Sequence, residues 1–416
     1  MSASGGRWWA AALGLALAAC GSTGAGPPDH PDASSELPAD AGLPDSGRPS
    51  DGGNGVDAGP PSACSAKPIL GPGTRITVDT TAIGETGTVA HQACLSARAA
   101  DGEGNAVGQW TATINGSPAL YFDSAYLPTG GAPLGTFPRG GTTNDRTRFF
   151  PLAQGWLVVP DIGGCCGPFD YLVTHVTSSL EAPDGGSDLT GAPPYGFTSV
   201  PGGGVAAYRT LAEQEGGSSC PPGGPSVERR IVINRWDAQG VKGPYADLGC
   251  YPDDTGGVVA GNAQGDVLAI FGGERWHLAP DGGLSHVSAG QTTGFIPLIG
   301  GLFAERAGSW NVVDAEGTII APGPQWLANS TDLGQVDIVL GGTAYLLHHF
   351  ATDDCGKALE LVLDDGTSCG FVDVQGPSTC PASAVTVGLD GTITALDAAS
   401  CTLFLWKGAV GPAPPP

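Results

Sequence analysis

Basic residues are scarce in this sequence. Its 416 residues include 17 lysines and arginines against 41 aspartates and glutamates, which gives a formal net charge of −24. From residue 64 to the end, 34 acids face 15 bases, so this part alone carries a charge of −19. Because nucleic acids and anionic lipid surfaces are bound mainly through Lys and Arg, the charge argues against both as partners.

Long apolar runs are missing as well. The uncharged run Trp8–Ala19 has 12 residues, whereas a membrane-spanning helix needs about 20. The run follows Arg7 and has the length of a signal-peptide core, so we expect residues 1–19 to be a signal peptide. Amphipathic spacing of 3.6 residues is also absent, and Gly or Pro interrupts nearly every window. We therefore expect no helix of three turns.

The signal peptide ends in Leu17-Ala18-Ala19-Cys20. This resembles the lipobox of bacterial lipoproteins, in which an aliphatic residue and two small residues precede an invariant cysteine. The resemblance implies cleavage before Cys20, a diacylglycerol on its sulfur and an acyl group on its amine, which together anchor the chain in a membrane. Gly21 then favours the outer membrane of a bacterial cell envelope. The alternative is an ordinary secretory signal in which Cys20 has no role.

The segment 20–63 has little that could form a core. Residues 21–63 contain 9 glycines and 8 prolines, no aromatic residue and only three large aliphatic residues. Such a composition cannot bury enough surface to offset the entropy of ordering it. We expect a disordered, acylated tether over residues 20–63 and a single domain over residues 64–416.

Short strands dominate the rest. Apolar runs such as "GWLVVPD", "RRIVINRWD" and "CTLFLWK" alternate with turns of Gly, Asp and Pro, which is typical of an all-β fold. A weak repeat combines a strand beside a glycine pair with a strand that leads into an Asp-led turn. Successive turn aspartates are 53, 44, 33 and 50 residues apart, and they are Asp184, Asp237, Asp281, Asp314 and Asp364.

A mean spacing of 45 residues resembles the four-stranded blade of a β-propeller, about 40–50 residues long. Radial repetition of blades also keeps exposed strand edges short. We predict seven blades, with six as the alternative, and closure of the ring by pairing of "TVGLDGTITALDAASCTLFLWK" with an N-terminal strand. The sequence lacks the repeated signatures of the WD40 and kelch families. A pair of β-sandwiches or a β-helix remains an alternative.

Export permits disulfides among the ten cysteines after Cys20. Pairing sequence neighbours gives bridges 64–94, 220–250, 355–369 and 380–401 and leaves an adjacent pair, although spacing alone cannot fix connectivity. The adjacent pair is then either a vicinal disulfide between flexible glycines or two halves of separate bridges, and metal binding is less favoured. The candidates are Cys64, Cys94, Cys165, Cys166, Cys220, Cys250, Cys355, Cys369, Cys380 and Cys401.

Residues that could carry catalysis are few. "GTSCG" around Ser368 matches the esterase pattern G-x-S-x-G, but a helix should follow that motif and none is expected here. His348 and His349 lie near Asp353 and Asp354, yet only one histidine can face a given side of a strand. We therefore assign no catalytic residue.

Paired acids raise the question of calcium. They are Asp253-Asp254 and Asp364-Asp365, but the EF-hand loop pattern is missing and Asp-Gly is also ordinary hairpin chemistry. We assign no metal ligand and expect no cofactor.

The sequence predicts a cell-envelope lipoprotein that acts as a non-catalytic binding or scaffolding module for a protein or a glycan. The main alternative is an extracytoplasmic hydrolase or lyase with its site at the channel of the propeller. A purely structural envelope protein is a third possibility. Fold alone does not decide among them.

Overall fold

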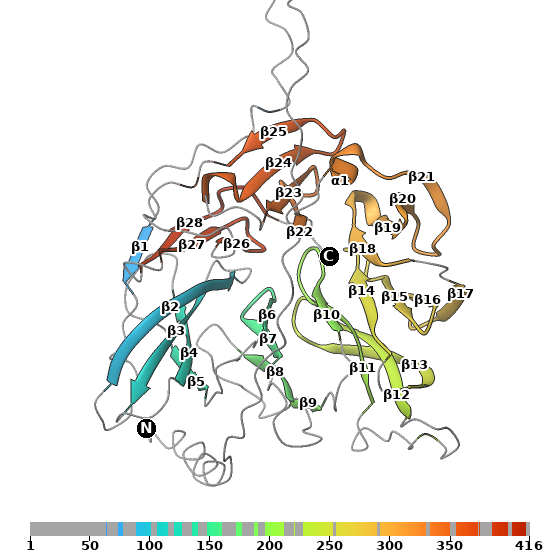
Figure 1. Ribbon diagram of the computed structural model, residues 1–416, viewed down its shortest axis with the longest axis horizontal. Coiled ribbons are helices and arrows are strands. Elements are labelled where there is room, and N and C mark those ends of the chain that lie inside the picture. The colour runs from blue at the N-terminus through green and yellow to red at the C-terminus, as the bar shows by residue number, and fades with distance from the viewer. Residues whose placement is uncertain are drawn as a thin grey trace, which may run out of the picture. The chain divides into compact units, whose positions relative to one another are not determined.

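The structure is a computed structural model, and the chain divides into two units, residues 1–62 and 63–416. Figure 1 labels the strands of the second unit. All residues that the structure describes lie in the second unit. They are residues 64, 74–77, 89–100, 106–114, 120–126, 135–139, 148–159, 172–176, 187–189, 196–211, 220, 228–252, 255–288, 292–329, 333–349, 355–372, 374, 385–397 and 402–412.

The described residues form seven four-stranded antiparallel sheets. Six sheets each take four consecutive strands, which follow one another in space as they do in the chain. The first three are β2 (Val89–Ala100), β3 (Ala106–Ile114), β4 (Leu120–Tyr126) and β5 (Gly135–Arg139); β6 (Arg148–Pro151), β7 (Trp156–Val159), β8 (Leu172–Val176) and β9 (Ser187–Leu189); and β10 (Gly196–Ser199), β11 (Val205–Thr210), β12 (Glu228–Trp236) and β13 (Lys242–Pro252).

The next three sheets repeat this pattern, and the longest helix among the described residues is α1 (Gln325–Asn329), with five residues. The sheets are β14 (Gly257–Gly261), β15 (Val267–Phe271), β16 (Glu274–Leu278) and β17 (Leu284–Ser288); β18 (Gly294–Pro297), β19 (Phe303–Ala307), β20 (Ser309–Val313) and β21 (Ile319–Pro322); and β22 (Leu333–Val339), β23 (Ala344–His349), β24 (Leu359–Leu363) and β25 (Ser368–Phe371).

The seventh sheet joins the two ends of the domain. Its order is β26 (Val385–Val387), β27 (Ile393–Asp397), β28 (Thr402–Trp406) and β1 (Thr74–Thr77). β1 pairs antiparallel with β28, with Thr74 opposite Leu405 and Thr77 opposite Thr402. The predicted pairing of the final segment with an N-terminal strand is therefore confirmed.

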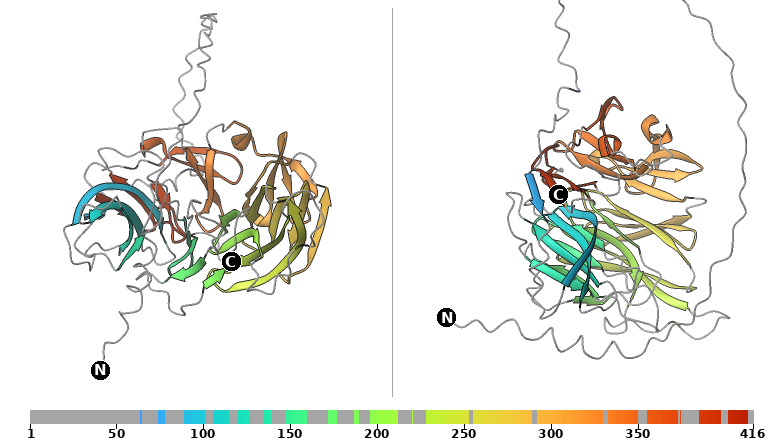
Figure 2. Two further views of the ribbon diagram at one scale, coloured as in Figure 1. Left: turned by 60° about the horizontal axis from the view of Figure 1, so that its bottom comes forward. Right: turned by 60° about the vertical axis from the view of Figure 1, so that its left-hand side comes forward.

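Buried side chains pack successive sheets against each other. Phe150 and Leu157 of the sheet β6–β9 share a core cluster with Phe197 and Trp236 of the sheet β10–β13. Further shared clusters join β10–β13 to β14–β17, β14–β17 to β18–β21, β18–β21 to β22–β25, and β22–β25 to β26–β28. Core residues therefore lie between the sheets along this series. Figure 2 shows the strands of these sheets from two further sides.

The first strand of a sheet contacts the first strand of the next one. Such contacts link β26 to β2, β2 to β6, β6 to β10, β10 to β14 and β14 to β18. Successive sheets therefore contact each other through their first strands, which we call the inner strands. Four-stranded antiparallel sheets repeated around inner strands are the architecture of a β-propeller, as the sequence predicted.

The predicted Asp-led turns explain the repeat. Asp237, Asp281, Asp314 and Asp364 all lie between the third and fourth strands of their sheets, whereas Asp184 lies outside the described residues. Asp237 Oδ1 accepts hydrogen bonds from the backbone N–H groups of Gln239 (2.9 Å) and Val241 (2.8 Å). An aspartate that holds its own turn in this way fixes the hairpin locally.

The sheets present two different ends. The turn between first and second strands has four or five residues in every sheet, for example 152–155 and 262–266. At the other end, connections between second and third strands range from one residue, Gly308, to the segment 211–227. Successive strands of each sheet alternate in direction. The turns between third and fourth strands therefore lie at the same end of the sheet as the turns between first and second strands. We call that end the short-turn face.

Two disulfides join described cysteines. Cys220–Cys250, with 5.9 Å between Cα atoms, confirms one predicted pair. Cys64 is bonded to Cys369, with 5.1 Å between Cα atoms, so the predicted pairs 64–94 and 355–369 are wrong. The physical reason is ring closure: β1 joins the sheet of β26–β28, which packs on the sheet of β25, so residue 64 lies beside residue 369.

The pairing of the remaining cysteines, and the lipidation of Cys20, stay predictions. Four of the candidates and the lipidation residue lie outside the described residues, as do the side chains of Cys94 and Cys355. The vicinal bridge is therefore still an expectation from the sequence. The residues wholly outside are Cys20, Cys165, Cys166, Cys380 and Cys401.

Candidate functional site

A crevice opens on the short-turn face between the sheets β10–β13 and β14–β17. Its volume is about 180 Å³, and three turns line it. The lining segments are 200–203, 235–238 and 262–267. Pockets for drug-sized ligands measure about 300–1,000 Å³, so this crevice fits a single side chain or a sugar hydroxymethyl group.

Arg235 at the end of β12 forms one wall. Its Nη1 donates to the carbonyl oxygen of Gly265 and its Nη2 to that of Pro280, both over 2.7 Å. Both acceptors belong to turns of the next sheet, so this guanidinium joins two sheets at the crevice. The contact is close: a Cβ on Gly265 would lie 1.7 Å from Nη1 of Arg235.

Asn262 and Asp266 also line the crevice, and hydrogen bonds hold both side chains in place. Asn262 Nδ2 donates to Asp266 Oδ2 (3.1 Å) and to the carbonyl oxygen of Gly301 (2.8 Å). Asp266 Oδ1 lies 2.9 Å from Nε2 of His277. The hydrogen bond from His277 lowers the pKa of Asp266 more than any other cause. Asp266 is therefore ionised at neutral pH and fixed in place.

Two exposed groups face solvent at the crevice. Asp237 uses Oδ1 for its turn, and its other oxygen accepts no hydrogen bond from the described part of the chain. The Gln264 amide is likewise exposed and has no hydrogen-bond partner among the described residues. Trp236 and Val267, both buried, form the floor. The crevice thus offers one carboxylate and one amide over an apolar base.

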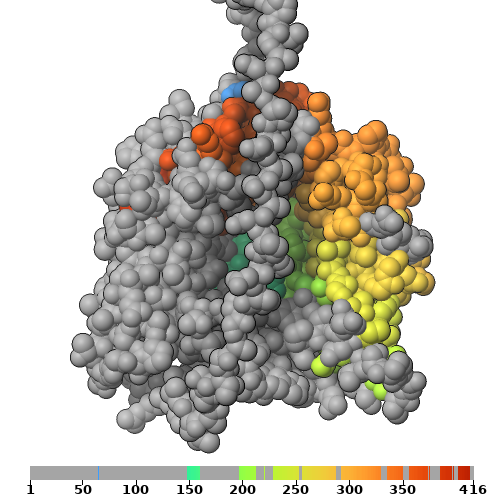
Figure 3. All heavy atoms as spheres, viewed as in Figure 1, coloured from blue at the N-terminus to red at the C-terminus, as the bar shows by residue number. Residues whose placement is uncertain are grey.

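Aliphatic side chains surround this face on three consecutive sheets. Val241 is 62% exposed, Leu284 37%, Ile319 62% and Ile320 53%. Each lies just after the Asp-led turn of its sheet, so all four belong to the short-turn face. We call these four residues the aliphatic rim. In Figure 3 the described residues of the sheets β14–β21, yellow to orange, form a continuous surface. The four residues therefore share one end of three consecutive sheets, and an apolar patch on a protein surface is typical of a binding site.

The esterase-like motif does not assemble a catalytic triad. Ser368 Oγ donates to Oε1 of Glu360 over 2.5 Å, and His349 Nε2 lies 3.1 Å from Oε2 of the same carboxylate. The carboxylate thus lies between serine and histidine, whereas nucleophilic catalysis needs the histidine in the middle. Ser368 also begins β25, after a hairpin turn, and Cys369 is in a disulfide.

The two adjacent histidines bind different carboxylates. His348, 2% exposed, has its Nε2 2.6 Å from Oδ2 of Asp337, while His349 contacts Glu360. They point to opposite sides of β23, as expected for a strand. Asp353 and Asp354 lie outside the described residues. The histidine pair therefore does not form one site in the described part.

Charged residues are rare on the inner strands. Six inner strands, β6, β10, β14, β18, β22 and β26, together contain two charged residues, Arg148 and Asp337, while β2 contains Arg98, whose side chain lies outside the described residues. Arg148 lies over the rings of Phe150 (5.7 Å) and Phe197 (6.0 Å). Asp337 accepts a hydrogen bond from Gln335 Nε2 over 2.9 Å in addition to its contact with His348. Arg148 and Asp337 thus each have a partner within the chain.

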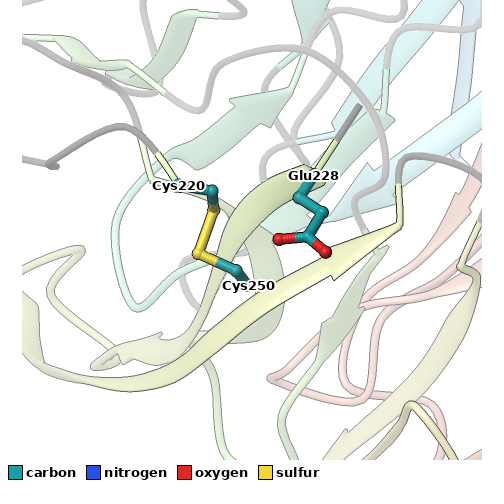
Figure 4. Close-up of side chains that lie close together, drawn as sticks. All are labelled: Cys220, Glu228 and Cys250. Carbon is teal, nitrogen blue, oxygen red and sulfur yellow. A yellow bond between two sulfur atoms is a disulfide. The ribbon is translucent and has the colours of Figure 1, made fainter. Parts of the chain in front are cut away.

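One group of side chains has the composition of a metal site. The ligand atoms of Cys220, Glu228 and Cys250 all lie within 4.8 Å of one another (Figure 4). Both sulfur atoms, however, are bonded to each other, and a disulfide offers no thiolate. The two cysteines therefore form a structural disulfide that joins the segment before β12 to the outer strand β13.

The acidic pairs do not form a calcium site among the described residues. Asp365 Oδ1 accepts a hydrogen bond from the backbone N–H of Thr367 over 2.9 Å, and this bond lowers the pKa of Asp365. That arrangement is hairpin chemistry. Asp253 and Asp254 lie outside the described residues.

The chain matches none of the known protein families and none of the curated proteins with which it was compared. Solved structures resemble it only distantly. BBS1N in its complex with ARL6DN is 11% identical with a TM-score of 0.37, over 82% of this chain and 96% of that one. A protein of unknown function from Bacteroides caccae is 11% identical with a TM-score of 0.32, over 61% and 90%.

A third such structure, the Dos1 propeller, is 8% identical with a TM-score of 0.30, over 70% of this chain and 75% of that one. Likenesses this weak carry no argument about function, and the propeller architecture rests on the sheet topology itself. No described helix has the length and apolar character that crossing a membrane requires.

Proposed function

We propose that this protein is a bacterial envelope lipoprotein whose propeller domain is a non-catalytic binding module. Support for the anchor comes from the sequence: a short apolar run, then Leu17-Ala18-Ala19-Cys20, then a Gly- and Pro-rich segment. In this proposal Cys20 carries the lipid, residues 21–63 form the tether, and the anchor is in the outer membrane.

We further propose that the domain is a closed ring of seven blades. Support comes from the seven four-stranded sheets and from the pairing of β1 with β28. The core clusters and inner-strand contacts also connect every sheet to the next in one series.

The proposed ligand is a protein surface, and the aliphatic rim is the observation that carries this proposal. Val241, Leu284, Ile319 and Ile320 are exposed at equivalent turns of three sheets. Burying such side chains contributes about 25 cal/mol per Å². The crevice beside the rim adds Asp237 and Gln264 for hydrogen bonds. A glycan would be bound by stacking on aromatic rings, and among the exposed large apolar side chains that the structure describes on these three sheets only Tyr245 (41% exposed) is aromatic.

The channel hydrolase or lyase gains no support from the described residues. It requires acids or histidines that converge on a reacting group. On the described inner strands only Asp337 offers a carboxylate, and that carboxylate already holds His348 and Gln335.

The test is covalent crosslinking in intact envelopes followed by affinity capture of the tagged protein. We expect Leu284→Asp and Ile319→Asp to lose the captured proteins that the wild type retains. Phe371→Asp is the matched control, because Phe371 (38% exposed) is about as exposed as Leu284 (37%) but lies on β25, outside the rim.

Two further arms separate the alternatives. Glycosidase treatment of the envelopes should leave capture unchanged, and loss of capture after it would instead indicate a glycan ligand. Equal capture by the wild type and both rim variants would refute the proposal that the aliphatic rim is the binding surface. Metabolic labelling with a fatty-acid probe tests the anchor, and a Cys20→Ala variant that still takes up label would refute acylation at Cys20.

A further inference from the structure

The first described residues of the domain reach two neighbouring sheets. Cys64 is bonded to Cys369 on β25, the outer strand of the sheet β22–β25. Ten residues later, β1 begins at Thr74 and is the outer strand of the sheet β26–β28. The chain thus passes from the outer edge of one sheet to the outer edge of the next.

We propose that the Cys64–Cys369 disulfide is a mechanical clamp. Tension that arrives from the N-terminal side passes through it into β25 and does not reach β1. This inference goes beyond the proposed binding function. It rests on the proposed lipid anchor only for the origin of the tension, because a body tethered to a membrane is pulled at its N-terminal side whenever its ligand moves.

β1 needs such protection because it is short and joined along one edge only. It has four residues, and among the described strands it pairs only with β28. Without the disulfide, tension would act first on the pair Thr74–Leu405 and then on the following pairs in turn. Hydrogen bonds that are broken one after another resist far less than a covalent bond does. Because β1 is the outer strand of the sheet β26–β28, its loss would strip that sheet of its fourth strand and expose the edge of β28.

The other end of the clamp is well supported. Cys369 packs against a core cluster that includes Leu346 and Leu361 of its own sheet and Leu403 and Leu405 of β28. β25 is as short as β1 and, among the described strands, pairs only with β24, so the core contact of Cys369 is what distinguishes the two attachment points. Tension delivered at Cys369 therefore enters a core shared by two sheets, instead of the free end of one strand.

Single-molecule force spectroscopy on the full mature chain tests the clamp. One handle replaces the lipid before Gly21, and the other is inserted in the turn 279–283 between β16 and β17. In the Cys64→Ser/Cys369→Ser variant we expect an early low-force step from release of β1, which frees the chain from residue 64 up to the start of β2 at Val89, at most about 90 Å. The oxidised wild type should lack this step.

The Cys220→Ser/Cys250→Ser variant is the matched control, since it loses a disulfide that is not on the proposed path of the force. It should give the wild-type trace. An early step of the same size in the wild type, or its absence from the Cys64→Ser/Cys369→Ser variant, would overturn the proposal.

A further variant keeps every cysteine and so does not depend on how the serine variants fold. It carries a protease site within residues 65–73, between Cys64 and β1. If the disulfide transmits the tension, cleavage of the oxidised protein leaves the force trace unchanged. A changed trace would show that the tension passes through β1 and would refute the clamp. A negative result in fatty-acid labelling would remove the lipid as the source of tension and would leave these traces as they are.

Discussion

Arg275 on β16 and Glu305 on β19 form an ion pair between two sheets. Arg275 Nη1 donates to Oε2 of Glu305 over 2.5 Å, and the two side chains are 12% and 5% exposed. Thr292 Oγ1 donates to the other carboxylate oxygen, also over 2.5 Å. The carboxylate thus satisfies both of its oxygens and neutralises a guanidinium that is largely removed from water.

Glu305→Ala should lower the free energy of unfolding by about 3–5 kcal/mol, because it leaves Arg275 buried without a counter-charge. Urea denaturation measures the change. The double variant Arg275→Met/Glu305→Leu should recover most of the loss, since apolar side chains need no partner there. Glu274→Ala, which breaks the exposed pair with His286, is the control and should cost less than about 1 kcal/mol. Equal costs for both carboxylates would contradict the importance of burial.

Gly265 and Gly273 offer a matched pair of substitutions by alanine. Both have positive φ, 89° and 80°, but a Cβ at Gly265 would meet Arg235 Nη1 at 1.7 Å, whereas nothing lies within 4 Å at Gly273. Gly273→Ala should cost only about 1–2 kcal/mol of backbone strain. At Gly265, Arg235 must also move and lose two charged hydrogen bonds, so the total should reach about 3 kcal/mol or more. Thermal unfolding compares them, and equal costs would mean that Arg235 does not hold the two sheets together.

Much of the fold could be predicted because its signals are local. The Asp-led turns repeat in the sequence since Asp237, Asp281 and Asp314 each accept hydrogen bonds from backbone amides two to four residues away. The pairing of the last strand with an N-terminal strand could also be predicted, because a ring of blades closes where the two ends of the domain meet. Pairing of Cys64 with Cys369 was not, because it depends on which sheets become neighbours once the ring closes.

The crevice could not be predicted for the same reason. Its hydrogen bonds join different sheets: Arg235 donates to Gly265, 30 residues later in the sequence, and Asn262 donates to Gly301, 39 residues later. The one local signal is the spacing of Asn262 and Asp266, which spans a turn between first and second strands. The motif around Ser368 is the converse case: it is visible in the sequence, but the structure does not arrange a catalytic triad around it.

Stability should fall in acid partly because of Asp266. Its folded-state pKa is lowered, chiefly by the hydrogen bond from His277, so the carboxylate contributes stability that is present above its unfolded pKa of about 3.9. That contribution is lost as the pH falls through the lower folded-state pKa. Urea unfolding between pH 6 and pH 2.5 should therefore show the wild type losing its advantage over Asp266→Asn only below about pH 4. Gln239→Ala, an uncharged exposed control, should differ from the wild type by a constant amount. If the difference in unfolding free energy between the wild type and Asp266→Asn were also constant over this pH range, the lowered pKa of Asp266 would be contradicted.

The two disulfides should stabilise the fold unequally, because they close loops of very different length. Cys64 and Cys369 are 305 residues apart, and Cys220 and Cys250 are 30 apart. Each doubling of a loop adds about 0.6 kcal/mol to the entropy that a bridge removes from the unfolded chain, so the longer loop should contribute about 2 kcal/mol more. Urea denaturation without reductant should therefore give Cys64→Ser/Cys369→Ser a larger loss than Cys220→Ser/Cys250→Ser. The reverse order would mean that local contacts around each bridge, and not chain entropy, set its contribution.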